Sequence, residues 1–175
     1  MKSRTEQVFL AAYEANKNAL FRHILMRISG DRDRATDLLS DVFARTWNAL
    51  CKGKEIENLR AYFYRVAHNL LVDEYGKPKV ISLDALSEES EHGELEVSEV
   101  SLHSDVVRLG ELSELTRALA KLPNDFREVL VLRYIDDMGP SQIAEILGES
   151  ANTVSVRINR ATAALREILN GVTNK

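Results

Sequence analysis

The sequence contains a single cysteine, Cys51, among its 175 residues, so a disulfide within the chain is excluded. The spacing of zinc ligands is also missing from its four histidines, which are His23, His68, His92 and His103. We interpret these histidines as ordinary surface or helix residues. The sequence therefore predicts no bound metal and no cofactor.

Signatures of an active site are equally scarce. The chain has no Gly-rich phosphate loop, no cluster of metal ligands and no nucleophile placed beside a base. We therefore do not expect an enzyme.

Long apolar runs are missing as well. None approaches the length of about 18 residues that a membrane span requires. The first residues, MKSRTEQVFLAAYEANK, form an amphipathic pattern that includes acids, whereas a signal peptide has a basic segment followed by an apolar one. We expect a cytoplasmic protein that does not insert into a membrane.

Basic residues are absent from one segment. Residues 80–107 hold eight of the 27 acids and neither Lys nor Arg, which leaves 19 acids against 23 basic residues elsewhere. The net charge of -4 therefore conceals two mildly basic halves around an acidic stretch. We predict a flexible acidic linker over 80–105, because its Ser- and Glu-rich composition cannot bury a core.

The residues before this linker predict three helices. Apolar residues recur at three- and four-residue spacing over 5–29, 33–50 and 59–75, with Gly30, Gly53 and Gly76 in or near the breaks. Either Asp31 or Asp33 can cap the second helix. We therefore predict a first helical domain over 1–79.

Helices are predicted again after the linker, so the fold class is all-α with two small domains. The second domain, 106–175, has helices expected over 106–121, 123–135 and 141–148, and a longer one after Ser150.

The end of this second domain has the pattern of a helix-turn-helix. A short helix ends at Gly148, Ser150 can cap the next, and small residues with Arg and Asn form the outer face of the last helix. A helical hairpin with a solvated polar face is the alternative. We favour DNA binding, because the turn, the cap and the polar face agree.

The helix over 59–75 carries large apolar groups on two faces. Phe63 and Leu70 belong to a stripe that suits a domain core, whereas Tyr64, Leu71 and Tyr75 lie among basic residues on the other side. Burial between neighbouring helices is one explanation for the second face. A platform on which unpaired bases stack is the other.

Three segments in this order resemble a known family. They are DLLSDVFARTWNAL, LRAYFYRVAHNLLVDEY and LPNDFREVLVLRYIDDMGPSQIAEILGESANTVSVRINRATAALREIL. With the acidic spacer between them, they are similar to the extracytoplasmic-function sigma factors of bacterial RNA polymerase. The similarity covers about residues 8–79 and 108–168.

The resemblance implies that the first domain binds polymerase and the minus-ten element. Its second helix would dock on the β′ clamp helices of core RNA polymerase. The residues implied at this contact or directly beneath it are Asp37, Leu38, Asp41, Phe43 and Trp47. The loop 51–58 would hold a flipped promoter base. The residues implied at the minus-ten element are Lys52, Lys54, Asn58, Tyr62, Arg65 and Asn69. In this interpretation the second face of the 59–75 helix is directed toward the non-template strand and the polymerase.

The resemblance implies that the second domain binds the minus-thirty-five element of promoter DNA and contacts the β flap. The residues implied are Thr153, Ser155, Arg157, Asn159 and Arg160. The linker would thread the RNA-exit path, and an anti-sigma factor would clamp the two domains.

Several expected basic residues are missing. Gly76, Ser155, Val156 and Thr162 stand where members of the family usually carry Arg or Lys. Fewer phosphate contacts weaken binding to free DNA. We therefore expect promoter affinity only in the presence of core polymerase.

A one-component helix-turn-helix regulator is the alternative function. Its first domain would sense a ligand or dimerise, and it would bind specific DNA without polymerase.

Overall fold

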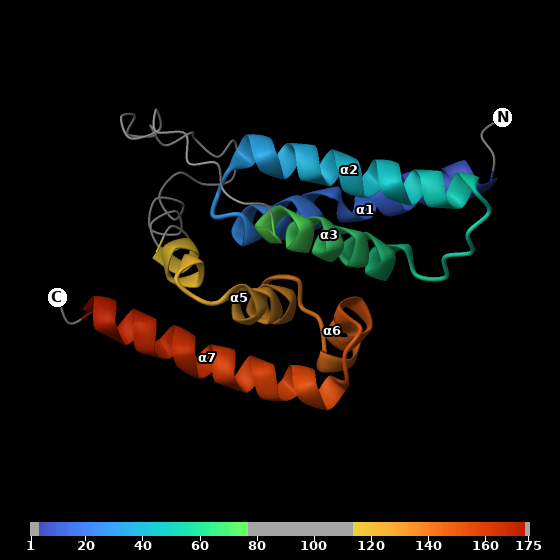
Figure 1. The fold of residues 1–175 in the computed structure, drawn as a ribbon. Coiled ribbons are helices and arrows are strands. Elements are labelled where there is room, and N and C mark those ends of the chain that lie inside the picture. Colours follow the sequence, from blue (N-terminus) through green and yellow to red (C-terminus); the bar gives the residue numbers. More distant parts are fainter. Residues whose placement is uncertain (1–3, 77–113, 174–175) are drawn as a thin grey trace, which may run out of the picture.

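The computed structural model describes residues 4–76 and 114–173, and these residues form helices and short connections without a strand (Figure 1). The predicted linker 80–105 lies outside the described residues, and so does the start of the helix predicted over 106–121. Among the described residues, the all-α prediction is confirmed. No helix of this described part has both the length and the apolar character needed to cross a membrane.

The first half is a bundle of three helices: α1 (Arg4–Arg27), α2 (Arg32–Cys51) and α3 (Leu59–Gly76). Asp31 is the N-cap of α2, since its side chain accepts a hydrogen bond from the backbone N–H of Arg34 at 3.0 Å. The turn before it passes through two left-handed residues, Ser29 and Gly30. Local cap and turn chemistry therefore sets the positions at which these helices begin and end.

Aromatic rings fill the centre of this bundle. Phe43 of α2 and Phe63 of α3 pack edge to face with ring centroids 5.0 Å apart. Phe9 of α1 lies 6.1 Å from Phe63 and 5.1 Å from the ring of Trp47. All three helices thus contribute rings to one cluster. The packing of these rings determines which faces of α2 and α3 lie on the outside of the bundle.

The second half begins with helical residues 114–120, followed by α5 (Asn124–Leu130), α6 (Pro140–Leu147) and α7 (Ala151–Thr173). The helix predicted over 123–135 is α5 together with a π-helical turn, η2 (Val131–Ile135), that continues it. Aside from this widened turn, the predicted elements match the described ones.

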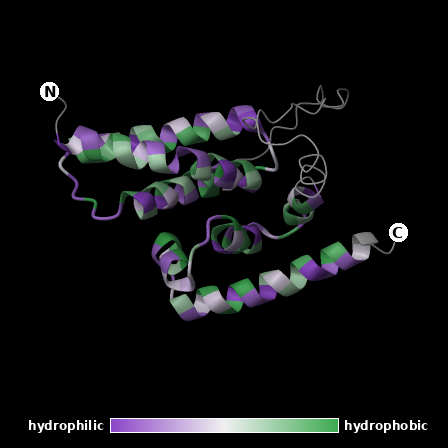
Figure 2. Cartoon of the chain, turned by 180° about the vertical axis from the view of Figure 1, so that it is seen from behind, coloured by the Kyte–Doolittle hydropathy of each residue, from purple (hydrophilic) through white to green (hydrophobic). Residues whose placement is uncertain are grey.

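The turn between α6 and α7 has the predicted chemistry. Gly148 ends α6 in the left-handed conformation, with a φ of 71°, which a residue without a side chain adopts at little cost. Ser150 caps α7 by accepting a hydrogen bond from the N–H of Thr153 at 3.1 Å. Figure 2 shows hydrophilic and hydrophobic residues alternating along α7. Its inner face buries Val154, Ile158 and Ala161.

The two halves pack directly on each other. The helix α3 lies against α6, and α1 lies against α5 and η2 (Figure 1). Their buried apolar residues form one continuous cluster that includes Leu71 from the first half and Ile143 from the second. The described residues are therefore in a closed arrangement, in which each half covers part of the other.

Candidate polymerase and nucleic-acid interface

The five candidate polymerase-binding residues on α2 separate into two groups. Asp37 and Asp41 are exposed and lie one turn apart, so their carboxylates occupy the same face. Leu38 and Phe43 are only 2% and 7% exposed, and Trp47 is half-buried. The acidic pair is therefore available to a partner, whereas the apolar residues support the helix from beneath.

The loop between α2 and α3 carries three candidate residues for the minus-ten element, all of them exposed: Lys52, Lys54 and Asn58. The ammonium of Lys54 lies 4.8 Å from the centre of the Tyr62 ring and 3.4 Å from its hydroxyl oxygen. Asn58 has a structural role as well, because its side-chain oxygen accepts a hydrogen bond from the N–H of Ala61. It thereby caps α3.

Three further candidates follow along one face of α3. Tyr62, Arg65 and Asn69 have helical spacing, and the last two are exposed while Tyr62 is half-buried. Arg65 is engaged with the second half, since its Nη2 donates a hydrogen bond to the backbone oxygen of Glu145 at 2.8 Å. One residue implied in strand binding is thus held against α6.

The second apolar face of α3 is buried. Tyr64 and Leu71 have no exposed surface, so neither offers a ring or side chain to DNA in this arrangement. For these two residues the explanation by burial is confirmed, whereas Tyr75, the third large residue of this face, is 37% exposed. The ring of Tyr64 packs on His23 of α1, and its hydroxyl donates to the Asp136 carboxylate at 2.8 Å.

Burial governs the acidity of Tyr64. Removal from water, together with the negative charge of Asp136, raises the pKa of its hydroxyl well above the ordinary value. The phenol therefore stays protonated and donates its hydrogen bond throughout the physiological pH range.

The candidate recognition helix, α7, presents most of its predicted residues. Thr153, Asn159 and Arg160 are exposed, and Ser155 is half-buried. Arg157 is held within its own domain, because its guanidinium lies 2.8 Å from the Glu149 carboxylate. Arg160 is thus more available to DNA than Arg157.

Two of the histidines are helix residues, as expected, but each of them also joins the two halves. His23 of α1 is 1% exposed, and its Nδ1 lies 2.8 Å from the Asp136 carboxylate. His68 of α3 lies 2.7 Å from the carboxylate of Glu128. The remaining histidines, at 92 and 103, lie outside the described residues.

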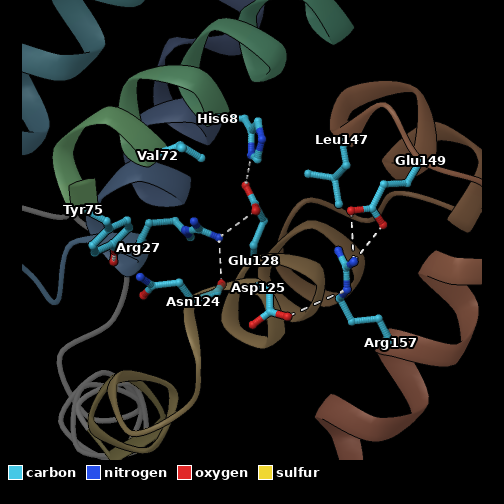
Figure 3. A pocket seen from close by; sticks show the side chains of 10 residues that line it. All are labelled: Arg27, His68, Val72, Tyr75, Asn124, Asp125, Glu128, Leu147, Glu149 and Arg157. Carbon is cyan, nitrogen blue, oxygen red and sulfur yellow. Dashed lines mark hydrogen bonds and ion pairs between the residues drawn. The ribbon is translucent and has the colours of Figure 1, made fainter.

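Glu128 pairs with two basic groups of the first half (Figure 3). Besides His68, it lies 3.3 Å from Nη1 of Arg27. Burial alone would raise the pKa of Glu128, but the hydrogen bond with His68 and the charge of Arg27 outweigh burial and lower that pKa below its ordinary value. Glu128 is therefore ionised at neutral pH.

A cleft of about 300 Å³ lies beside Glu128, between the two halves (Figure 3). Arg27 and Arg157 line it, and each is paired with a carboxylate. The charged side chains that line the cleft are therefore largely paired with other side chains of this protein. Among the described residues, no group of His, Cys, Asp or Glu side chains is arranged to hold a metal ion.

The helix-turn-helix of the second domain is the motif of a DNA-binding protein. The sequence matches two family models in the corresponding places. Residues 12–79 match Sigma-70 region 2, and residues 112–165 match Sigma-70, region 4.

Similar proteins agree with these matches. The chain is 28% identical to the ECF RNA polymerase sigma factor SigW of Bacillus subtilis over 97% of this chain and 92% of the relative. It is 29% identical to the ECF RNA polymerase sigma factor SigL of Mycobacterium tuberculosis over 89% and 85% of the two chains. The chain belongs to the sigma-70 family and is a sigma factor of the extracytoplasmic-function group, which acts in transcription initiation.

Solved structures share the fold. The sigma factor RpoE of Bartonella quintana, in complex with the anti-sigma factor NepR, matches with a TM-score of 0.71 and 23% identity, over 94% of this chain and 98% of that chain. CnrH, in complex with the cytosolic domain of CnrY, matches with a TM-score of 0.66 and 23% identity, over 94% and 89% of the two chains.

Proposed function

We propose that this sigma factor binds core RNA polymerase, directs it to specific promoters and assists their melting, without catalysing a reaction itself. The observation that carries the proposal is the pairing of a region 2 domain with a region 4 helix-turn-helix in one chain. A one-component regulator needs only the second of these. Because its partners are polymerase and the chromosome, the protein would work in the cytoplasm. We also retain the boundaries 1–79, 80–105 and 106–175 for the first domain, the linker and the second domain.

The acidic edge of α2 suits a polymerase contact. Asp37 and Asp41 would pair with basic side chains on the β′ clamp helices, because two carboxylates one turn apart offer a short line of acceptors to a facing helix. Leu38, Phe43 and Trp47 would act beneath this contact by fixing the position of the helix.

The loop before α3 and one face of that helix would hold the melted minus-ten strand. Lys52 and Lys54 would neutralise phosphates, while the amides of Asn58 and Asn69 offer donors and acceptors to base edges. Tyr62 supplies a ring next to the loop, and its neighbour Arg65 supplies a planar cation. These groups distinguish an unpaired strand from a duplex, since stacking requires a free base face.

The outer face of α7 would read the minus-thirty-five element from the major groove. Asn159, Arg157 and Arg160 can reach base edges or phosphates, and the small side chains of Thr153 and Ser155 allow a close approach. The same domain would rest on the β flap, which fixes its distance from the first domain on the promoter.

An anti-sigma factor is the proposed inhibitor. Two similar structures, RpoE with NepR and CnrH with CnrY, are of complexes, the first of them described as one with an anti-sigma factor. A partner of this kind would hold the two domains away from polymerase.

Co-elution with purified core polymerase on a sizing column, followed by a DNA-binding assay with and without polymerase, tests the proposal. We expect a complex with the polymerase and specific DNA binding only in that complex. Specific DNA binding by the free chain without a polymerase complex would support the one-component regulator instead.

A further inference from the structure

A large apolar side chain lies exposed on the outer face of α7. Val156 is 42% exposed, whereas Val154, Ile158 and Ala161 of the same helix are buried. At 3.6 residues per turn, Val156 lies about 200° around the helix axis from Val154, so the two side chains are on opposite faces. The apolar cluster of the described residues accordingly includes the three buried side chains but not Val156. Val156 therefore lies outside the core of its domain.

Polar side chains surround Val156. Asn152 lies one turn before it and Arg160 one turn after it, and Asn159 lies beside it on the same face. All three are exposed, and each can form hydrogen bonds with a base edge or a phosphate. Val156 has no polar atom in its side chain. It therefore places one apolar contact near the middle of a polar surface.

The stability of α7 does not account for a valine at this position. Val is a poorer helix former than Ala, because its branched side chain loses rotamer freedom in a helix. Val156 is also one of the positions at which an expected Arg or Lys is missing, so it contributes no charge toward a phosphate. What Val156 adds to this face is an apolar contact for the partner that covers it.

The major groove of DNA offers an apolar group to such a side chain. Thymine carries a methyl group there, at C5, whereas the groups that distinguish the other bases are hydrogen-bond donors and acceptors. Val cannot pair with donors and acceptors, and covering them without a partner costs free energy. The branched side chain also prefers one rotamer in a helix, so its two methyl groups are already in position before DNA binds.

We propose that Val156 is a specificity-determining residue, which selects a T·A base pair in the minus-thirty-five element by packing against the C5 methyl group of thymine. The inference rests on the proposed function, because it requires the outer face of α7 to lie in the major groove. The position suits this contact: α7 begins at Ala151, and the first residues of a recognition helix are the ones that reach base edges.

Replacing thymine by deoxyuridine tests the contact at the level of one methyl group. A promoter that the chain selects together with core polymerase is prepared with each thymine of its minus-thirty-five element, on either strand, replaced in turn by deoxyuridine. The equilibrium dissociation constant of the complex of polymerase and this chain is measured for each duplex. At one position we expect the wild type to bind about fourfold more weakly, which corresponds to the loss of one buried carbon.

Two valine-to-alanine variants show whether the methyl group is read by Val156. In Val156→Ala the partner of the thymine methyl is missing, so affinity for the unmodified promoter should fall and deoxyuridine should cost less than about twofold more. Val8→Ala is the matched control, because Val8 is 54% exposed and lies on α1. The control should keep the whole effect of deoxyuridine. Val156→Thr, which retains one methyl group and the branch, should keep part of it.

Salt dependence and stability distinguish this contact from a general loss of binding. An apolar contact releases no counterion from DNA, so Val156→Ala should lower the affinity without changing the slope of log affinity against log salt concentration. Its thermal unfolding midpoint should equal or exceed that of the wild type, because Ala is the better helix former at an exposed position. Weaker binding by this variant would then not reflect an unfolded domain.

Several results would overturn the proposal. These are an equal effect of deoxyuridine on the wild type and on Val156→Ala at every position, no effect on the wild type at any position, and a minus-thirty-five element without a T·A pair. Each of them leaves the proposed function intact, because promoter binding would still require the chain and polymerase. A wild-type chain that selected no promoter with core polymerase would instead contradict the proposed function, and this inference with it.

Discussion

His23 and Asp136 are 113 residues apart in the chain, yet His23 Nδ1 and an Asp136 carboxylate oxygen lie 2.8 Å apart in the interior. The two residues belong to the region 2 and region 4 domains respectively. Both side chains are almost fully buried, so the pair exists only while the two domains are in contact. In the interior, the two domains are thus joined by a buried polar pair as well as by a shared apolar cluster.

The acidic edge of α2 predicts a loss of polymerase binding without a loss of stability. Replacing Asp37 and Asp41 with Asn removes both exposed carboxylates and should abolish the complex with core polymerase on a sizing column. Phe43→Ala is the contrasting variant, because this ring is 7% exposed and packed against Phe63. It should lower the free energy of unfolding by about 3–5 kcal/mol. An Asp37→Asn, Asp41→Asn chain that still co-elutes with polymerase would refute the assigned contact.

The recognition helix predicts a selective loss of promoter binding. Arg157→Ala and Arg160→Ala should each weaken the polymerase–promoter complex by about 1–3 kcal/mol, measured as the equilibrium dissociation constant at fixed salt. Where the lost contact is to a phosphate, one fewer counterion is released on binding. The slope of log affinity against log salt concentration should then become shallower by about one. Arg166→Ala, an exposed change farther along the same helix, should leave the affinity unchanged. Equal effects of all three would exclude a reading face centred on Arg160.

The cap of α3 predicts that two roles of Asn58 can be separated. Asn58→Ala removes the acceptor for the N–H of Ala61 and should lower the free energy of unfolding by about 0.5–2 kcal/mol. Asn58→Ser retains an acceptor and should restore most of that stability. If Asn58 also contacts a promoter base, the Ser variant should still melt promoters poorly in a permanganate footprint. Normal melting by a stable Ser variant would limit Asn58 to its structural role.

The low pKa of Glu128 predicts a loss of stability in acid. Its carboxyl is held below its ordinary pKa of 4.5 in the folded chain by His68 and Arg27, against the effect of burial. The ionised form is therefore favoured by folding, and its contribution is present above pH 4.5 and lost as the pH falls through the folded pKa. The unfolding free energy of the wild type should fall more steeply between pH 6 and pH 3 than that of Glu128→Gln. Glu145→Gln, which removes an exposed carboxylate, should follow the wild type, and parallel curves for all three chains would contradict the assignment.

Local signals explain which parts of the fold were predictable. Asp31, Gly148 and Ser150 act on residues within a turn of themselves, so the caps and the turn between α6 and α7 follow from the sequence. Helical spacing similarly identified the inner face of α7. The two apolar faces of α3 were also visible, but spacing alone did not identify the neighbour of the second face.

The interdomain groups were not predictable, because their partners are remote in sequence. Nothing near His23 indicates that Asp136 lies beside it, and nothing near Tyr64 indicates that its hydroxyl has a buried acceptor. Likewise, nothing near Arg65 indicates that its guanidinium donates a hydrogen bond to the backbone oxygen of Glu145. A buried contact of this kind is specified by the packing of whole domains, and its sequence signal is limited to polar residues on otherwise apolar faces.

Run-off transcription on a library of genomic fragments tests the central claim most directly. Purified core polymerase is supplied with or without this chain, and the transcripts are sequenced. The account predicts transcripts that require the chain and that start downstream of a shared pair of elements near minus thirty-five and minus ten. The same transcripts with and without the chain, despite a folded chain and an active polymerase, would contradict it.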